Sequence, residues 1–165
     1  MEKSLGIVPI REDNSCLWGA IDIDIYPVKH SELIQKLVKQ NDLPFVITRS
    51  KSGGAHCFIF MKEPVSSSIM QEKLKELSAA FGYAKAEIFP KQTKLLLDKG
   101  DRGNILNMPY FGGELSTRYA HDDSGVAITD LDEFVKYVET KKITVKRLES
   151  LVAKSVDVTS KDPDL

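Results

Sequence analysis

Two aspartates stand two positions apart in the apolar run from Trp18 to Tyr26, and their spacing could support chemistry. The alternation predicts a β-strand, in which residues two apart point to the same face. Asp22 and Asp24 would then lie roughly 7 Å apart. Two carboxylates this close repel each other, and a pair of hard divalent cations is a usual counter-charge. The pattern is typical of metal-dependent phosphoryl transfer, and a solvated strand face is the simpler alternative. The opposite face would carry Leu17, Ile21, Ile23 and Ile25.

A polar, glycine-bearing turn follows, with the sequence Arg49-Ser-Lys-Ser-Gly-Gly-Ala-His56. Glycines let a backbone approach a phosphate closely and present N–H groups to it. The candidate contacts are Arg49, Lys51, Ser52, Gly53, Gly54 and His56. We expect a phosphate site at this turn, with an ordinary hairpin turn and a structural histidine as the alternative. It is not a Walker A loop, because the required spacing of glycine and lysine is absent.

Two later segments place polar side chains in strand-like runs. Glu87 interrupts a short apolar run and could complete a set of three carboxylates with the two aspartates. Lys91 and Gln92 follow this apolar run and could reach a phosphate or a base. Asn104 and Asn107 suit hydrogen bonding to a sugar hydroxyl or a base. A plain surface or loop position is the alternative for Glu87, Lys91 and Gln92, and hydrogen bonding to neighbouring loops is the alternative for the two asparagines.

The pattern of apolar residues predicts a mixture of strands and helices to hold these side chains. Strands are expected at 5–10, 16–26, 45–48, 57–61, 86–89 and 104–108. Helices are expected at 32–40, 66–81, 130–140 and 144–154, with Ser31 capping the first and Ser66 to Ser68 capping the second. Residues 91–103 and 112–126 are expected to be loops. Hairpins combined with helices favour an α/β (α+β) two-layer domain with a mixed sheet.

Composition limits the classes of protein that the chain can represent. It has 165 residues, 42% of them hydrophobic, with a net charge of −1, which fits one globular domain. The neutral balance predicts weak or transient nucleic-acid contact, helped by local basic patches at 49–51 and 85–102. No apolar run is long enough to span a membrane, and no secretory signal is present at the N-terminus. Cys16 and Cys57 should be buried free thiols, so we expect a cytoplasmic location.

The order of these motifs resembles that of the archaeo-eukaryotic primase superfamily. The resemblance rests on Asp-Ile-Asp at 22–24, Ser-Lys-Ser-Gly-Gly-Ala-His at 50–56, Glu-Ile-Phe-Pro-Lys-Gln at 87–92 and Gly-Asn-Ile-Leu-Asn-Met-Pro-Tyr-Phe at 103–111. It covers roughly residues 5–111 and looks most like the primase-polymerase branch of phages, plasmids and TOTE-type conflict systems. The fold it implies is an N-terminal α/β unit joined to an RRM-like sheet flanked by helices.

The resemblance also implies an activity and roles for individual residues. Asp22, Asp24 and Glu87 would be the catalytic ligands of two Mg²⁺ or Mn²⁺ ions, and Ser52 and His56 would contact nucleotide phosphates. The implied enzyme is a DNA primase-polymerase that transfers nucleotides from dNTPs or NTPs to a nucleic-acid 3′-hydroxyl. Its implied partners are a single-stranded DNA template and a primer, with a helicase or a helical accessory domain as further candidates. The implied setting is a phage or a plasmid.

The chain departs from the family pattern in three respects. Ser52 and His56 are separated by a longer Gly-Gly-Ala insert than in a strict Ser-x-His motif. The third acid is Glu87 where many members have aspartate, so Asp98 or Asp101 could be the ligand instead. No cysteine cluster for a zinc-binding insert is present.

We divide the chain into a catalytic core at 1–129, C-terminal helices at 130–154 and a frayed tail at 155–165. The helices would pack on the core or lead to a missing domain. Two other functions stay open. One is a non-catalytic nucleic-acid- or nucleotide-binding module of a replication assembly, and the other is a metal-dependent nuclease or phosphohydrolase.

Overall fold

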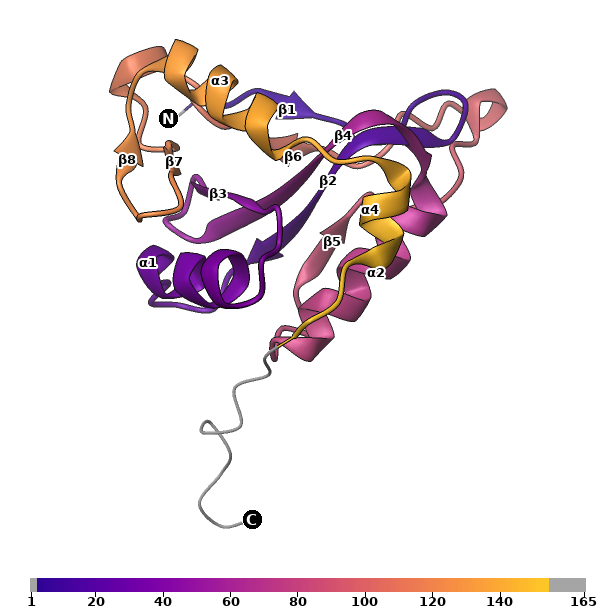
Figure 1. Ribbon diagram of the computed structural model, residues 1–165. Helices are drawn as coiled ribbons and strands as arrows, with labels where there is room; N and C mark the ends of the chain where they lie inside the picture. The colour runs from indigo at the N-terminus through magenta and orange to yellow at the C-terminus, as the bar shows by residue number, and fades with distance from the viewer. Residues whose placement is uncertain (1–2, 155–165) are drawn as a thin grey trace.

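A six-stranded sheet runs through the middle of the molecule (Figure 1). The computed structural model describes residues 3–154, apart from the side chain of Glu114. The strand order is β5-β2-β4-β3-β7-β8, with β2 at Ser15–Ile23, β3 at Val46–Arg49, β4 at Ala55–Ser66, β5 at Glu87–Phe89, β7 at Ala120–His121 and β8 at Ala127–Ile128. A separate two-stranded ribbon pairs β1 (Gly6–Ile7) with β6 (Leu106–Asn107). The expected α+β class is confirmed.

The sheet is antiparallel in each of its strand pairs, whereas a mixed sheet was expected. The reason lies in the connection from β4 through a helix to β5. These two strands run in the same direction, but β2 lies between them and is antiparallel to both. Within residues 3–154, parallel pairing outside the named strands is limited to an isolated bridge between Met61 and Ile143.

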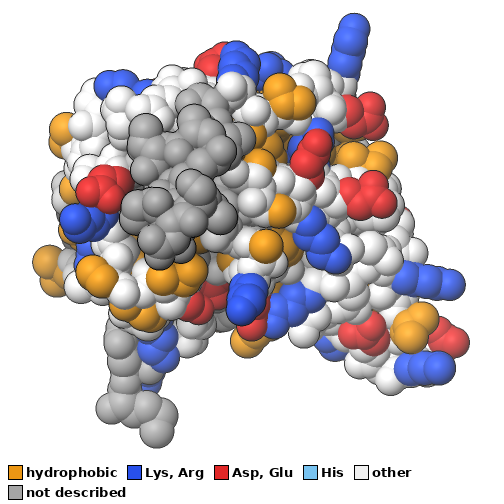
Figure 2. All heavy atoms as spheres, turned by 90° about the horizontal axis from the view of Figure 1, so that it is seen from below, with side chains coloured by type: hydrophobic (Ala, Val, Ile, Leu, Met, Phe, Trp, Pro, Cys, Tyr) orange, Lys and Arg blue, Asp and Glu red, His pale blue; other side chains and the backbone are white. Residues whose placement is uncertain are grey.

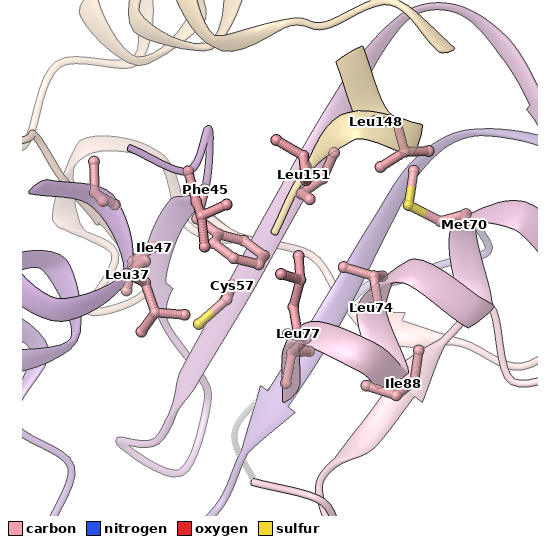
Figure 3. Close-up of a cluster of buried hydrophobic side chains, with 14 of the residues drawn as sticks. Leu37, Phe45, Ile47, Cys57, Met70, Leu74, Leu77, Ile88, Leu148 and Leu151 are labelled. Atoms are coloured by element: carbon pink, nitrogen blue, oxygen red, sulfur yellow. The ribbon is translucent and has the colours of Figure 1, made fainter. Parts of the chain in front are cut away.

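Helices pack on one face of this sheet. They are α1 (His30–Leu33), which continues as the π-helical segment η1 (Ile34–Gln40), α2 (Ser67–Ala80) and α4 (Val145–Ser150). Figure 3 shows side chains from these helices and the central strands converging in the larger core. Its buried members include Leu37, Phe45, Ile47, Cys57, Met70, Leu74, Leu77 and Leu148. Each such side chain contributes about 1.5–3 kcal/mol when it is fully buried. Within residues 3–154, no helix has both the length and the apolar character needed to cross a membrane.

The opposite face of the sheet is covered at one end only. There α3 (Leu131–Lys141) and the β1–β6 ribbon pack on a second cluster, in which the Tyr110 and Phe134 rings stack with centroids 4.5 Å apart. Two short 3₁₀ turns, η2 (Leu97–Lys99) and η3 (Gly113–Leu115), lie in the loops. The expected two layers are therefore supplemented by a partial third. This face of the sheet also carries Asp22 and His56.

Several predicted boundaries need correction. The strand expected at 16–26 ends at Ile23, which leaves Asp24 in the following segment and Ile25 exposed. An irregularity between Cys16 and Trp18 exposes Leu17, because the strand slips in register there. Residues 112–126 are not only a loop, since they supply β7 to the sheet. The first helix begins before Ser31, which therefore is not its N-cap. The helix expected at 144–154 ends at Ser150. The tail expected at 155–165 lies outside the described residues.

The second and third helices begin as the sequence predicts. The Ser66 hydroxyl accepts a hydrogen bond from the Ile69 N–H, and the Asp130 carboxylate accepts bonds from the Asp132 and Glu133 N–H groups at 2.8 and 3.2 Å. Such caps satisfy N–H groups that have no partner within the helix. They fix where α2 leaves β4 and where α3 starts across the sheet.

Asp130→Ala should lower the free energy of unfolding by about 1 kcal/mol, because two N–H groups of α3 lose their acceptor. Urea unfolding followed by circular dichroism measures the change. Glu72→Ala, which removes an exposed carboxylate from the middle of α2, is the control and should change stability by less than about 0.5 kcal/mol. Equal effects from the two variants would contradict the capping role.

Candidate functional site

Four polar side chains form a row across four strands of the sheet. The strand register pairs Glu87 with Asp22, Asp22 with His56, and His56 with Thr48. Residues paired in this way point to the same face, with Cβ atoms about 4.5–5.5 Å apart. The row therefore brings together residues from β5, β2, β4 and β3 that are far apart in sequence. His56 and Glu87 were predicted to join Asp22, whereas Thr48 was not.

Asp22 lies in the middle of this row, and its side chain is largely shielded from solvent. Its side chain is 14% exposed, and its Oδ1 atom is buried without a hydrogen bond from residues 3–154. The nearest cationic candidate is His56, whose Nε2 atom lies 3.5 Å from that oxygen, too far and too poorly aligned for a hydrogen bond. A buried carboxylate oxygen without a hydrogen bond is costly, and a bound cation would offset that cost.

The glycine-bearing turn closes the β3–β4 hairpin beside this row, as predicted. The Ser50 N–H donates to the Gly54 carbonyl at 3.0 Å, and the Gly53 N–H donates to the Ser50 carbonyl at 3.1 Å. Gly53 has φ +88°, a left-handed conformation that glycine adopts without strain. Lys51 and Ser52 lie exposed at the tip, where they can meet a ligand.

Gly54 is the point at which the turn touches the acidic segment. A Cβ atom at this position would lie 2.6 Å from the Ile23 carbonyl oxygen and 3.0 Å from both Asp24 Oδ1 and Ser50 Oγ. Only a residue without a side chain allows this approach. Gly54 is therefore needed for packing against Asp24. The sequence analysis had assigned this glycine to phosphate binding.

Tyr26 joins the acidic segment to the turn, a role that the sequence analysis did not predict. Its hydroxyl donates to Asp24 Oδ1 at 3.1 Å and is also hydrogen-bonded to the Ser52 hydroxyl. Because the tyrosine proton goes to the carboxylate, Ser52 is the donor in the second bond. Asp24 is exposed, so this bridge is what holds its carboxylate beside the turn.

Asp22, Asp24 and Glu87 line one pocket of about 260 Å³, together with Tyr83 and Lys85. Glu87 itself is exposed and pairs with Lys91, whose Nζ lies 3.2 Å from Glu87 Oε2 and 5.1 Å from the centre of the Phe89 ring. The side chain of Lys91 thus reaches the rim of the acidic cluster, and its contact with a phosphate or base stays a prediction.

The three candidates for the third acidic ligand, Glu87, Asp98 and Asp101, lie in different parts of the structure. Asp101 is occupied in its own loop, where it accepts hydrogen bonds from Gly103 N–H, Leu96 N–H and the Gln92 amide. The bond from Gly103 is the main reason that the pKa of Asp101 falls below its usual value. The same loop is fastened at Leu95 to Asn14, directly before the start of β2.

Asp22 stands near the other end of β2, seven residues from Ser15 and roughly 23 Å away at about 3.3 Å per residue. Asp98, in the η2 turn of that loop, lies at the far end with Asp101. Glu87 is paired directly with Asp22, so it is the acid that the fold brings to the aspartates.

Asn104 and Asn107 belong to a different part of the molecule. Asn107 lies in β6, where it pairs with Gly6 of β1, and Asn104 is exposed just before that strand. Their segment covers the second core cluster rather than the acidic pocket. Gln92 holds the 91–103 loop through its bond to Asp101. These three residues are not gathered with Asp22 and His56.

Arg49 faces the helical layer at the end of β3. Its Nη1 atom lies 3.4 Å from His30 Nδ1, and its guanidinium group stands 5.7 Å from the centre of the Tyr119 ring. His30 and His121 are in edge-to-face contact with ring centroids 5.3 Å apart. Burial is the main cause that lowers the pKa of both histidines, and the Arg49 charge lowers it further.

The three carboxylates suit a metal ion by their chemistry. Hard divalent cations prefer oxygen ligands, and the buried Asp22 Oδ1 lacks a hydrogen bond from the described residues. Within residues 3–154, no group of three or more His, Cys, Asp or Glu side chains already stands in metal-binding positions. Asp24 and Glu87 are both exposed, so their side chains have room to turn toward a shared ion.

A larger groove of about 580 Å³ lies beside the pocket and shares Ile23, Ile25 and Tyr83 with it. Its rim carries Lys29 and Lys36. Figure 2, which views the molecule from below, shows lysine, arginine and acidic side chains scattered among hydrophobic ones, with no single positive patch. This agrees with the net charge of −1 and limits how strongly a nucleic acid is held by charge alone.

Comparison with known families gives one match. Residues 1–151 match the family model described as the archaeo-eukaryotic primase domain of the TOTE conflict system. No curated protein matches the chain. The family match spans the sheet, the turn and the helices described above.

Proposed function

The chain belongs to the archaeo-eukaryotic primase domain family of TOTE conflict systems, and from this we propose that it is a metal-dependent nucleotidyltransferase acting on nucleic acid. The finer proposal is a DNA primase-polymerase that adds nucleotides from dNTPs or NTPs to a primer 3′-hydroxyl on a single-stranded template. One observation carries it: Glu87, Asp22 and His56 are neighbours across the sheet, with a glycine turn packed against Asp24.

Asp22, Asp24 and Glu87 would hold two Mg²⁺ or Mn²⁺ ions. When bound, such ions lower the pKa of an attacking hydroxyl and neutralise charge on the phosphates. The row geometry supports this assignment, because the carboxylates come from adjacent strands and from the segment after one of them. Asp22 would be the most rigid ligand, since it is held within β2.

The turn and His56 would bind the triphosphate. His56 is 5% exposed and fixed in β4, with its ring in edge-to-face contact with Phe58 at 6.0 Å. A donor fixed in this way stabilises developing charge without having to reorganise. Lys51 and Ser52, exposed at the tip of the turn, would add a positive charge and a hydroxyl group, with Arg49 supplying positive charge from behind the turn.

Metal dependence gives a direct test of this function. The protein is incubated with a primed template, labelled dNTPs or NTPs and Mn²⁺, and the products are separated on a denaturing gel. We expect primer extension, its loss on addition of EDTA, and its recovery when excess Mn²⁺ or Mg²⁺ is returned. Cleavage of the template would indicate a nuclease instead. A gel shift without extension would indicate a non-catalytic binding module.

A further inference from the structure

His30 makes a contact with the turn that the proposed chemistry does not use. The imidazole is 7% exposed, and its Nε2 atom lies 2.9 Å from the Gly54 carbonyl oxygen. That oxygen also accepts the Ser50 N–H at 3.0 Å, so both of its lone pairs are engaged. The bond reaches from the start of α1 to the base of the turn. It therefore ties the turn to an element outside the hairpin.

The protonation state of this imidazole follows from its two neighbours. Since the Gly54 carbonyl can only accept, Nε2 must carry a proton. Arg49 Nη1 can only donate, so Nδ1 must present its lone pair to it, at 3.4 Å. His30 is thus a neutral histidine of one tautomer, and its ring is in edge-to-face contact with that of His121, with centroids 5.3 Å apart.

The consequence lies on the other side of Gly54. That residue packs against the Ile23 carbonyl and the Asp24 carboxylate, so any shift of its carbonyl toward solvent would move the turn away from the acidic segment. We propose that His30 is a positioning residue, whose hydrogen bond holds the Ser50–Gly54 turn against Asp24 in the form that binds the nucleotide triphosphate. The inference rests on the proposed function for its ligand.

A positioning role predicts a particular kinetic effect. Without the bond, only a fraction of the molecules hold the turn in the binding form, and the apparent affinity falls by that fraction. His30→Leu, which fills the space but cannot donate, should raise KM for the nucleotide about tenfold while changing kcat by less than about threefold. His30→Gln retains an N–H donor and should recover most of the loss in KM.

A second measurement reads the turn without any activity. Amide hydrogen exchange at Ser50 and Gly53, which donate within the turn, should speed up in His30→Leu and return toward the wild-type rate in His30→Gln. His121→Leu is the matched control, because it alters the same buried cluster without removing a hydrogen bond to the turn. It should leave KM and both exchange rates unchanged.

Each outcome supports or overturns the positioning role of His30. The inference is overturned if His30→Gln is no better than His30→Leu, or if His121→Leu raises KM equally, since either result points to packing alone. Unchanged KM and unchanged exchange in His30→Leu overturn it as well. If the wild-type protein incorporates no nucleotide, the proposed function fails. The exchange rates then still decide whether His30 holds the turn.

Discussion

Asp22→Asn is expected to reduce nucleotidyl transfer by at least about 1000-fold, equivalent to about 4 kcal/mol of transition-state stabilisation. Asparagine has the shape of aspartate but lacks the negative charge that a metal ion requires. The same change should leave the fold intact, because the Asp22 Oδ1 atom is buried without a hydrogen bond from residues 3–154 and so contributes nothing to stability by that route. The melting temperature of the metal-free protein should be unchanged or higher.

Asp98→Asn supplies the control, since it makes the same chemical change on an exposed loop at the other end of the sheet. Single-turnover extension of a labelled primer, with thermal unfolding in parallel, compares the two variants. Asp22→Asn with near-normal extension would show that the metal site has been assigned to the wrong residues. A large loss in Asp98→Asn would return that residue to consideration as the third ligand.

Gly54→Ala should reduce extension by about 100-fold, because a displacement of about 1 Å at a catalytic group has an effect of that size. The added methyl group would meet the Ile23 carbonyl at 2.6 Å and the Asp24 carboxylate at 3.0 Å. Backbone atoms cannot rotate away as a flexible side chain can. We therefore expect the turn and Asp24 to separate, with a loss of about 1–3 kcal/mol in the free energy of unfolding.

Gly100→Ala separates this effect from the general cost of replacing a glycine. Gly100 has φ +77° and open space around the position of a Cβ atom, so alanine there introduces backbone strain without a clash. Its expected cost is about 1 kcal/mol, with extension unaffected. If Gly54→Ala extends primers as well as Gly100→Ala does, the contact with Asp24 is irrelevant to catalysis.

Local pattern was sufficient to predict much of this fold. Alternation identified β2, and the polar turn between two apolar runs identified the β3–β4 hairpin with His56 on the same face as Phe58. Serine and aspartate at the right places identified the starts of α2 and α3. These features depend on residues that are close together in the sequence, so a local pattern is enough to predict them.

Features set by distant contacts were harder to predict. The end of β2 at Ile23 depends on where β5 and the turn stop pairing with it, so Asp24 could not be placed from spacing alone. The choice of Glu87 over Asp98 depends on strand pairing. The strand of Asn107 pairs with β1 rather than with the main sheet, and this pairing also depends on a contact distant in the sequence.

Two residues at the site were missed by the sequence analysis. Tyr26 and His30 follow the acidic strand in a segment without a regular pattern, and each acts through one hydrogen bond to the turn. A polar aromatic residue and a histidine shortly after the two aspartates are the cue that could have pointed to them.

The row across the sheet also determines when the site can exist during folding. Glu87, Asp22, His56 and Thr48 come from four strands, and only His56 and Thr48 belong to a local hairpin. Pairing of β2 with β4 and of β5 with β2 closes long loops, and contacts of this kind form slowly. A refolding chain should therefore regain metal binding with its slowest, non-local phase rather than with the hairpin. Recovery of activity would then serve as a measure of complete folding.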